Sequence, residues 1–274
     1  MLQTVQAETA GSFQWLRAAG NPAVRVITNK AGRAVLRAQA DGASVKVYEA
    51  HSPGHAAFIA AVSERHPQHF PNVIDCRDSW VVAEWAAGSS PWPLPVREHV
   101  ALLRKIHATP IAELPSPGFC YWNDYLVPRF MRAASLFEKK DRAQEIVRIA
   151  GSTGFAPLVM HPDLTPANLL RTNSGVLVSV DNELLTIGTH PLLDVFNAIK
   201  PLRENARHDF LREWFSDDRP SEELIERTAL AWIVRETGAA FLRGAFVECE
   251  RYLSASADDA KYLLRMPLEL LAPK

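Results

Sequence analysis

The sequence predicts an α+β protein with a small antiparallel β-rich N-terminal lobe and a larger, mainly α-helical C-terminal lobe. Within residues 23–50, three short apolar runs alternate as strands do, whereas from residue 96 onwards apolar residues recur at helical spacing. The chain has 274 residues, of which 47% are hydrophobic and 22% charged. A chain of this length and composition can bury a substantial core in each of two lobes.

The β-rich part comes first. Turn-forming residues at 29–32 and 41–42 separate the three apolar runs, which predicts an antiparallel meander. The expected strands are residues 23–27, 33–37, 44–48, 72–74 and 80–83, with a helix around residues 56–62 between the third and the fourth.

The boundary between the lobes is expected at residues 84–90. Pro91, Pro93 and Pro95 follow Gly88 closely, and neither a helix nor a central strand continues through such a stretch. We therefore divide the chain into an N-terminal lobe, residues 1–84, and a C-terminal lobe, residues 85–274. In the second lobe, helices are expected at 96–107, at 130–150 and over most of the chain after 190.

Composition excludes several classes of partner. The formal net charge of −1 supplies no basic field for nucleic acid. The three cysteines are widely separated and lack Cys-x-x-Cys spacing, which indicates reduced thiols rather than a zinc site or a disulfide framework. The N-terminus lacks the pattern of a signal peptide, and no apolar run is long enough to span a membrane. We therefore expect a soluble cytoplasmic protein.

The most informative segment runs from His161 to Asn168 and is followed, after an apolar strand, by Asp181. The spacing His-x-Asp-Leu-x-x-x-Asn, with a later acid at a strand end, is typical of phosphoryl-transfer enzymes. Asp163 is then the base that orients the attacking hydroxyl. Asn168 and Asp181 supply the oxygen ligands that magnesium prefers.

Each piece of this pattern also has a structural interpretation. Asp163 could cap a helical turn, Asp181 could be a polar strand end, and Lys46 could be a solvated strand lysine. The order of the pieces favours chemistry, because both loops follow apolar strands and Lys46 lies upstream on the third strand. There it alternates with Val45 and Val47, so its side chain could reach the α and β phosphates of a nucleotide.

Taken together, the motifs resemble those of the aminoglycoside phosphotransferase and choline kinase family, which shares the protein-kinase fold. The resemblance covers about residues 23–200 and is carried by residues 45–48, 81–88, 102–110, 161–168 and 181–183. It implies ATP, with GTP not excluded, and magnesium as cofactors. It also implies that residues 1–84 are the nucleotide-binding lobe and residues 85–274 the catalytic and substrate-binding lobe.

The resemblance also assigns roles to individual residues. It places a hinge that reads the nucleotide base at Glu84, Trp85 and Ala86. It makes Asp194 a structural support of the catalytic loop, and it makes His161 a scaffold that hydrogen-bonds the backbone near Asp181. His107, at a helix end, is interpreted as a packed or dipole-compensating residue.

Three departures from the family pattern matter. Pro162 replaces the glycine of the family and the arginine of protein kinases, so it cannot answer an activation-loop phosphate. The first hairpin lacks a Gly-x-Gly-x-x-Gly loop. The following helix has His55 where a glutamate is expected to pair with Lys46, which leaves Glu49 and Glu64 as the nearby candidates.

The expected function is an ATP- and magnesium-dependent phosphotransferase that acts on a hydroxyl of a small molecule, such as a sugar, an amino alcohol or an antibiotic-like metabolite. A kinase-like binding protein without turnover stays open because of the missing glutamate and glycines. An atypical bacterial protein kinase is disfavoured, because the segment between Asp181 and Asp194 is too short for the usual activation segment.

Two clusters could hold a cationic acceptor. Residues 201–274 contain 14 acidic and 11 basic residues, a net charge of −3, which is only mildly acidic and argues against an aminoglycoside. An acidic cluster could bind an amine and three aromatic residues could cage a quaternary ammonium, although a solvated helix face and a core are the commoner outcomes. The acids are Asp217, Asp218, Glu222, Glu223 and Glu226, and the aromatic residues are Phe210, Trp214 and Phe215.

Overall fold

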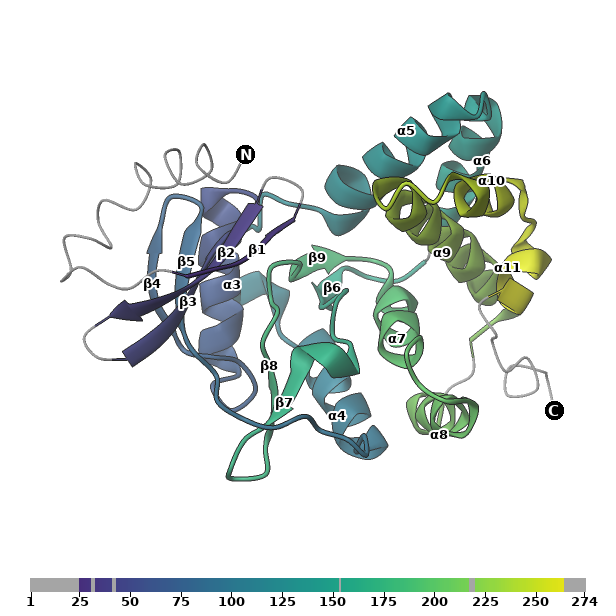
Figure 1. Cartoon of the computed structure of the whole chain (residues 1–274). Coiled ribbons are helices and arrows are strands. Elements are labelled where there is room, and N and C mark those ends of the chain that lie inside the picture. The colour runs from purple at the N-terminus through teal and green to yellow at the C-terminus, as the bar shows by residue number, and fades with distance from the viewer. Residues whose placement is uncertain (1–24, 31–32, 41–42, 153, 217–219, 264–274) are drawn as a thin grey trace.

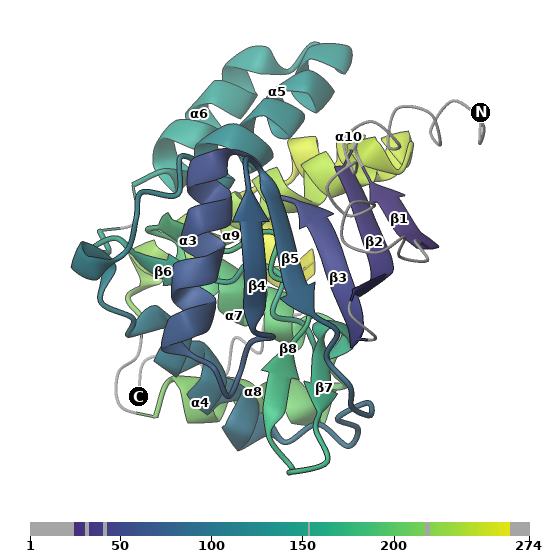
Figure 2. The ribbon, with the colours of Figure 1, turned by 90° about the vertical axis from the view of Figure 1, so that its left-hand side faces the viewer.

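The computed structural model describes residues 25–30, 33–40, 43–152, 154–216 and 220–263. Its N-terminal part is a five-stranded antiparallel sheet in the order β1-β2-β3-β5-β4, with helix α3 against one face (Figure 2). The elements are β1 Arg25–Lys30, β2 Arg33–Ala40, β3 Ala43–Glu49, α3 Pro53–Arg65, β4 Val73–Arg77 and β5 Trp80–Glu84. The meander is confirmed, while residues 23–24 and the predicted turn residues 31–32 and 41–42 lie outside the described ranges.

Strand β3 occupies the centre of this sheet and sets the direction of Lys46. Val45 and Val47 are buried in a small apolar cluster on one face. Because side chains alternate along a strand, Lys46 and Tyr48 point to the other face, where the Lys46 ammonium lies 4.9 Å from the centre of the Tyr48 ring.

Helix α3 begins at a well-formed cap. Ser52 Oγ accepts a hydrogen bond from the backbone N–H of His55 at 3.0 Å, and Pro53 occupies the first turn, where a missing N–H costs nothing. Phe58, Ile59 and Val62 are fully buried in the main core. The helix is thereby fixed against the sheet.

The C-terminal part is mainly helical, so the α+β class and the two-lobed, kinase-like architecture are confirmed (Figure 1). Its helices are α4 Val96–His107, α5 Val127–Leu136, α6 Lys140–Ala150, α7 Pro191–Ile199, α8 Glu204–Trp214, α9 Glu222–Leu242, α10 Phe246–Ser254 and α11 Ala257–Leu263. The division of the chain into units 1–84 and 85–274 stays a prediction.

One helix prediction is wrong. Residues 130–150 form parts of two helices, α5 and α6, because the chain turns back between them. Glu138 adopts a positive φ of 56°, and the N–H of Lys139 returns to the carbonyl of Ala134 at 2.9 Å. A left-handed residue with such a returning bond ends a helix even where the apolar spacing continues.

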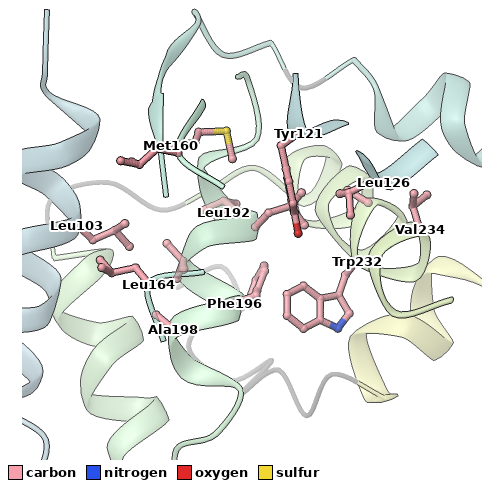
Figure 3. Packing of buried hydrophobic residues seen from close by; sticks show 14 of the residues in the cluster. Leu103, Tyr121, Leu126, Met160, Leu164, Leu192, Phe196, Ala198, Trp232 and Val234 are labelled. Carbon is pink, nitrogen blue, oxygen red and sulfur yellow. The ribbon is translucent and has the colours of Figure 1, made fainter. Parts of the chain in front are cut away.

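The core of the larger lobe joins the helices to the catalytic segment. Helix α9 is buried over much of its length and packs against α5, α6, α10 and α11. Leu103 of α4, Leu164 of the catalytic segment and Phe196 of α7 belong to the same buried cluster (Figure 3). None of the described helices combines the length and the apolar character that a membrane crossing requires.

Four short strands frame the predicted catalytic segment. β6 pairs with β9, and β7 pairs with β8, in both cases antiparallel. Their bounds are β6 Leu158–Met160, β7 Leu169–Arg171, β8 Leu177–Ser179 and β9 Thr186–Gly188, and the single turns are Ile111–Glu113, Tyr121–Leu126 and Pro166–Asn168. β6 leads into residues 161–168 and β8 leads into Asp181.

The segment after β5 is held to the larger lobe. Ser89 and Arg171 exchange both backbone hydrogen bonds, at 3.0 and 2.9 Å. Gly88 passes so close to β7 that a Cβ atom there would lie 2.7 Å from the Arg171 carbonyl oxygen. The contact therefore requires glycine.

Candidate active site

A cleft of about 890 Å³ opens between the sheet and the helical lobe. Every site residue predicted from the sequence lines it, although these residues are up to 135 positions apart. They are Lys46, Glu84, Trp85, Ala86, Asp163, Asn168 and Asp181. The structure thus brings the predicted residues together, while their individual roles stay predictions.

The catalytic segment is held from two helices. Buried Asp194 of α7 accepts a hydrogen bond from the backbone N–H of His161 at 2.7 Å. Asn197 of α7 donates to the carbonyl of Pro162, and the His99 ring of α4 donates to the carbonyl of Leu164 at 2.9 Å. These contacts fix the backbone on both sides of Asp163.

The same Asp194 oxygen lies 3.0 Å from the His107 ring. His107 is therefore part of the support of the catalytic segment, through α4. This contact goes beyond the predicted packing role. No local pattern indicates it, because the two residues are 87 positions apart.

The His161 ring connects the catalytic segment to the end of β8. Its Nε2 lies 2.9 Å from both Asn182 Oδ1 and Ser179 Oγ. Both partners are side-chain oxygens. The prediction that His161 hydrogen-bonds the backbone near Asp181 is therefore wrong about the partner. Burial lowers the pKa of His161 below its ordinary value, and the fully buried neutral ring acts as a spacer between the two loops.

Lys46 bridges the sheet and the segment after β8. Its ammonium donates to the Val180 carbonyl at 2.8 Å and to Asp181 Oδ1 at 3.0 Å, and lies 2.8 Å from Glu183 Oε1 in an ion pair outside hydrogen-bond geometry. The expectation that Glu49 or Glu64 pairs with Lys46 is wrong. The partner comes instead from beside the predicted metal ligand.

The Lys46 ammonium lies between two carboxyl groups, those of Asp181 and Glu183. Burial lowers the pKa of Lys46, but the two carboxylates more than offset this effect, so its pKa is raised and it stays protonated. Burial, with the hydrogen-bonded Asp181 beside it, raises the pKa of Glu183 to about 7. A buried cation between two acids is positioned before any ligand arrives.

His55 has a different task at the position where a glutamate was expected. Its Nε2 donates to the carbonyl of Leu185 at 2.6 Å, and its Nδ1 accepts from the backbone N–H of His51 at 3.1 Å. Helix α3 is thus connected to the segment that carries Asp181 and Glu183 by a neutral ring rather than by a carboxylate.

The predicted metal ligands suit a hard cation. The side-chain nitrogen of Asn168 donates to the Asp163 carbonyl at 2.9 Å, which leaves the amide oxygen as the available ligand atom. Asp181 contributes a partly exposed carboxylate. Among the described residues, no group of three or more histidine, cysteine, aspartate or glutamate side chains could hold a metal ion.

The predicted hinge follows β5 directly. The backbone N–H of Trp85 donates to the Ser44 carbonyl at 3.0 Å, so it is not available to a nucleotide base. The Trp85 ring is partly exposed, with the Arg37 guanidinium 4.5 Å from its centre. The backbone N–H of Glu84 is engaged in the same way, because it donates to the Asn72 carbonyl at 2.9 Å. Among these three residues, a backbone N–H for the base would therefore come from Ala86.

Comparison with known proteins agrees with this geometry. The model of the phosphotransferase enzyme family matches residues 16–225, which is more than half of the chain. The chain belongs to this family. A search among curated proteins finds no matching sequence.

Several solved structures share the fold of this chain. Choline kinase LicA from Streptococcus pneumoniae aligns with a TM-score of 0.62 at 13% identity, covering 97% of this chain and 99% of that one. An aminoglycoside-3′-phosphotransferase of type VIII aligns at 0.58 and 19%, covering 83% and 98%. The streptomycin–ATP–APH(2″)-IIa ternary complex aligns at 0.61 and 12%, covering 92% and 98%.

Several residues that line the cleft were not predicted from the sequence. Glu183 could have been found, because it follows Asp181 by two positions and alternate residues of an extended segment share a face. Tyr125, Arg129, Leu242 and Arg243 also line the cleft. No motif indicates them, because their position depends on the packing of α5 against α9.

Proposed function

We propose that this chain transfers the γ-phosphoryl group of ATP, in a magnesium-dependent reaction, to a hydroxyl of a small molecule. The observation that carries the proposal is the convergence of Lys46, Asp163, Asn168 and Asp181 on one cleft. Phosphoryl transfer needs positioning and charge neutralisation more than covalent help from the protein, and these four side chains supply both.

Each residue has a defined task in this reaction. Lys46 binds the α and β phosphates, and Asn168 and Asp181 hold magnesium, which neutralises charge on the phosphates when it is bound. Asp163 accepts the proton of the acceptor hydroxyl as that oxygen forms its bond to the γ-phosphorus. The bond from this phosphorus to the bridging oxygen breaks, and ADP leaves with the electron pair.

The comparisons support the donor and the class of acceptor. The APH(2″)-IIa structure is a ternary complex with ATP and streptomycin, and LicA is a choline kinase. In APH(2″)-IIa the fold therefore accommodates ATP together with a small molecule. A cytoplasmic location, with a supply of ATP, belongs to the same proposal.

The proposal is tested by turnover. The protein is incubated with ATP and a panel of hydroxyl compounds, with and without magnesium, and both ADP and phosphorylated product are measured. Product is expected only when protein, magnesium, ATP and acceptor are all present, and Asp181→Asn should lower its rate by about a hundredfold or more. Asp75→Asn, on the edge strand β4, is the matched control and should keep the wild-type rate.

Two outcomes would favour the alternatives. A thermal shift with ATP and magnesium but no product with any hydroxyl compound would indicate a binding protein without turnover. Transfer to protein serine or threonine but not to small molecules would indicate a protein kinase. The ion pairs of Lys46 weaken the first alternative, because the lysine has acidic partners without a glutamate on α3.

A further inference from the structure

The cleft has a second end, for which the motifs assign no residue. Tyr125 of the turn Tyr121–Leu126, Arg129 of α5, and Leu242 and Arg243 at the end of α9 line it. Strands β6 and β9 lie between the sheet and helices α5 and α9 (Figure 1). The predicted nucleotide-binding residues Lys46, Glu84, Trp85 and Ala86 line the cleft from the sheet side. We therefore take this second end as the acceptor side.

Arg129 is a cation held in place by packing against an aromatic ring and a neighbouring helix. Its guanidinium carbon lies 3.3 Å from the centre of the Tyr125 ring, and its Cβ packs against Gly238 of α9, where an added Cβ atom would approach to 3.2 Å. In the part of the chain that the structure describes, no carboxylate forms an ion pair with it. A half-buried cation costs solvation energy, which an incoming anion would offset.

Two more arginines belong to this part of the molecule, and each forms an ion pair with a glutamate. Arg243 lies 3.3 Å from Glu248, but both side chains are about half exposed, so the pair holds Arg243 only loosely. Arg235 is largely buried behind the site, pairs with Glu236, and also interacts electrostatically with Asp163. The other carboxylates that line the cleft, Glu49, Glu84, Asp181 and Glu183, come from the sheet and the metal segment.

The described residues that were considered as a site for a cationic acceptor do not line the cleft. Phe210 is fully buried against His99, and Trp214 packs edge-on to His107. Glu223 forms an ion pair with Arg227 of its own helix. None of the described members of the two clusters lines the cleft, and Asp217 and Asp218 lie outside the described residues.

We propose that the phosphate acceptor is an anionic hydroxy compound, whose carboxylate or phosphate group binds Arg129 while its hydroxyl reaches Asp163. Arginine suits either group, because its planar fork donates two parallel hydrogen bonds to a pair of oxygens. Arg243, at the mouth, is free to turn onto the same group. This inference rests on the proposed kinase function and names its substrate class.

The test separates acceptors by charge. A metabolite extract is divided by ion exchange into anionic, neutral and cationic fractions, and each is incubated with the protein and magnesium·[γ-³²P]ATP. Label is expected in small molecules of the anionic fraction. Glycerate and glycerol phosphate then serve as carboxylate and phosphate probes, with glycerol as their neutral counterpart.

Substitutions of Arg129 test whether this residue causes the preference for an anionic acceptor. Arg129→Gln should lower kcat/KM for the labelled anionic compound by roughly ten- to a hundredfold, the usual effect of one charged hydrogen-bonding contact, and Arg129→Lys should lower it less. Arg132→Gln is the matched control, because Arg132 is exposed on the same helix and does not line the cleft. Thermal unfolding of all three variants checks that they fold.

The remaining outcomes distinguish failure of the proposed substrate class from failure of the kinase function. Label in the neutral or cationic fraction, or an anionic acceptor that Arg129→Gln uses as well as the wild type does, would overturn the substrate class and leave the kinase function standing. No label in any fraction, or label that Asp163→Asn retains, would contradict the kinase function and this inference with it.

Discussion

At the scale of single residues, the site depends on where Lys46 finds its acidic partner. The helix position that should carry a glutamate holds His55, and the negative charge comes instead from Glu183, two residues after Asp181. One short segment therefore supplies both a predicted metal ligand and an acidic partner of Lys46. We therefore expect a change in this segment to affect nucleotide binding more than a change on α3 does.

Glu183→Gln is expected to lower kcat/KM for ATP by about tenfold, because Lys46 loses one of its two charged partners and is less well positioned. Steady-state kinetics with varied ATP measure this effect. Glu64→Gln is the control, since Glu64 is exposed late on α3 and was the alternative partner expected from the sequence. A loss in Glu64→Gln with none in Glu183→Gln would contradict the assignment.

At the scale of elements, the segment after β5 positions the two lobes through its contact with β7. Its backbone pairs with Arg171, and the approach at Gly88 leaves no room for a side chain. Leu170, beside this contact, lines the cleft. The fit of this segment therefore affects the shape of the site as well as stability.

Gly88→Ala should reduce the free energy of unfolding by about 1–3 kcal/mol, because the new Cβ displaces backbone that cannot move without breaking the bridge to Arg171. Thermal or urea unfolding measures the change. Ala87→Ser, at the exposed neighbouring position, should unfold as the wild type does. Equal stability of Gly88→Ala and the wild type would show that the contact is looser than described.

The sequence predicts some parts of this fold better than others. The direction of Lys46 and the segment from His161 to Asn168 follow from local alternation and from spacing that the chemistry itself requires. The break between α5 and α6 does not, because a single left-handed residue, Glu138, ends α5 while the apolar pattern continues. Arg129 reaches the cleft only through packing of α5 on α9, for which no local signal exists.

At the scale of the whole molecule, several histidines are built into the interior as neutral groups. Burial lowers the pKa of His66, His99, His161 and His190, and that of His99 falls to about 4. Since the unfolded value is about 6.5, the unfolded chain binds more protons between these two values. Stability is therefore lost as the pH falls from about 6.5 towards 4.

His99 alone should lower the free energy of unfolding by about 2 kcal/mol between pH 7 and pH 5. Urea unfolding at the two pH values measures the loss. His99→Gln keeps a donor for the Leu164 carbonyl but cannot titrate, so its loss should be smaller by about that amount. A loss of stability in His99→Gln identical to that of the wild type would refute the account.

The central claim is that Asp163 accepts the proton of a small-molecule hydroxyl during transfer from ATP. The most direct measurement is a single-turnover assay of acceptor phosphorylation with the wild type and Asp163→Asn, each saturated with magnesium·ATP. Because asparagine keeps the shape of the side chain but cannot accept the proton, transfer should slow by about a hundred- to ten-thousandfold while ATP binding stays unchanged. Equal transfer rates in the two proteins would contradict the account.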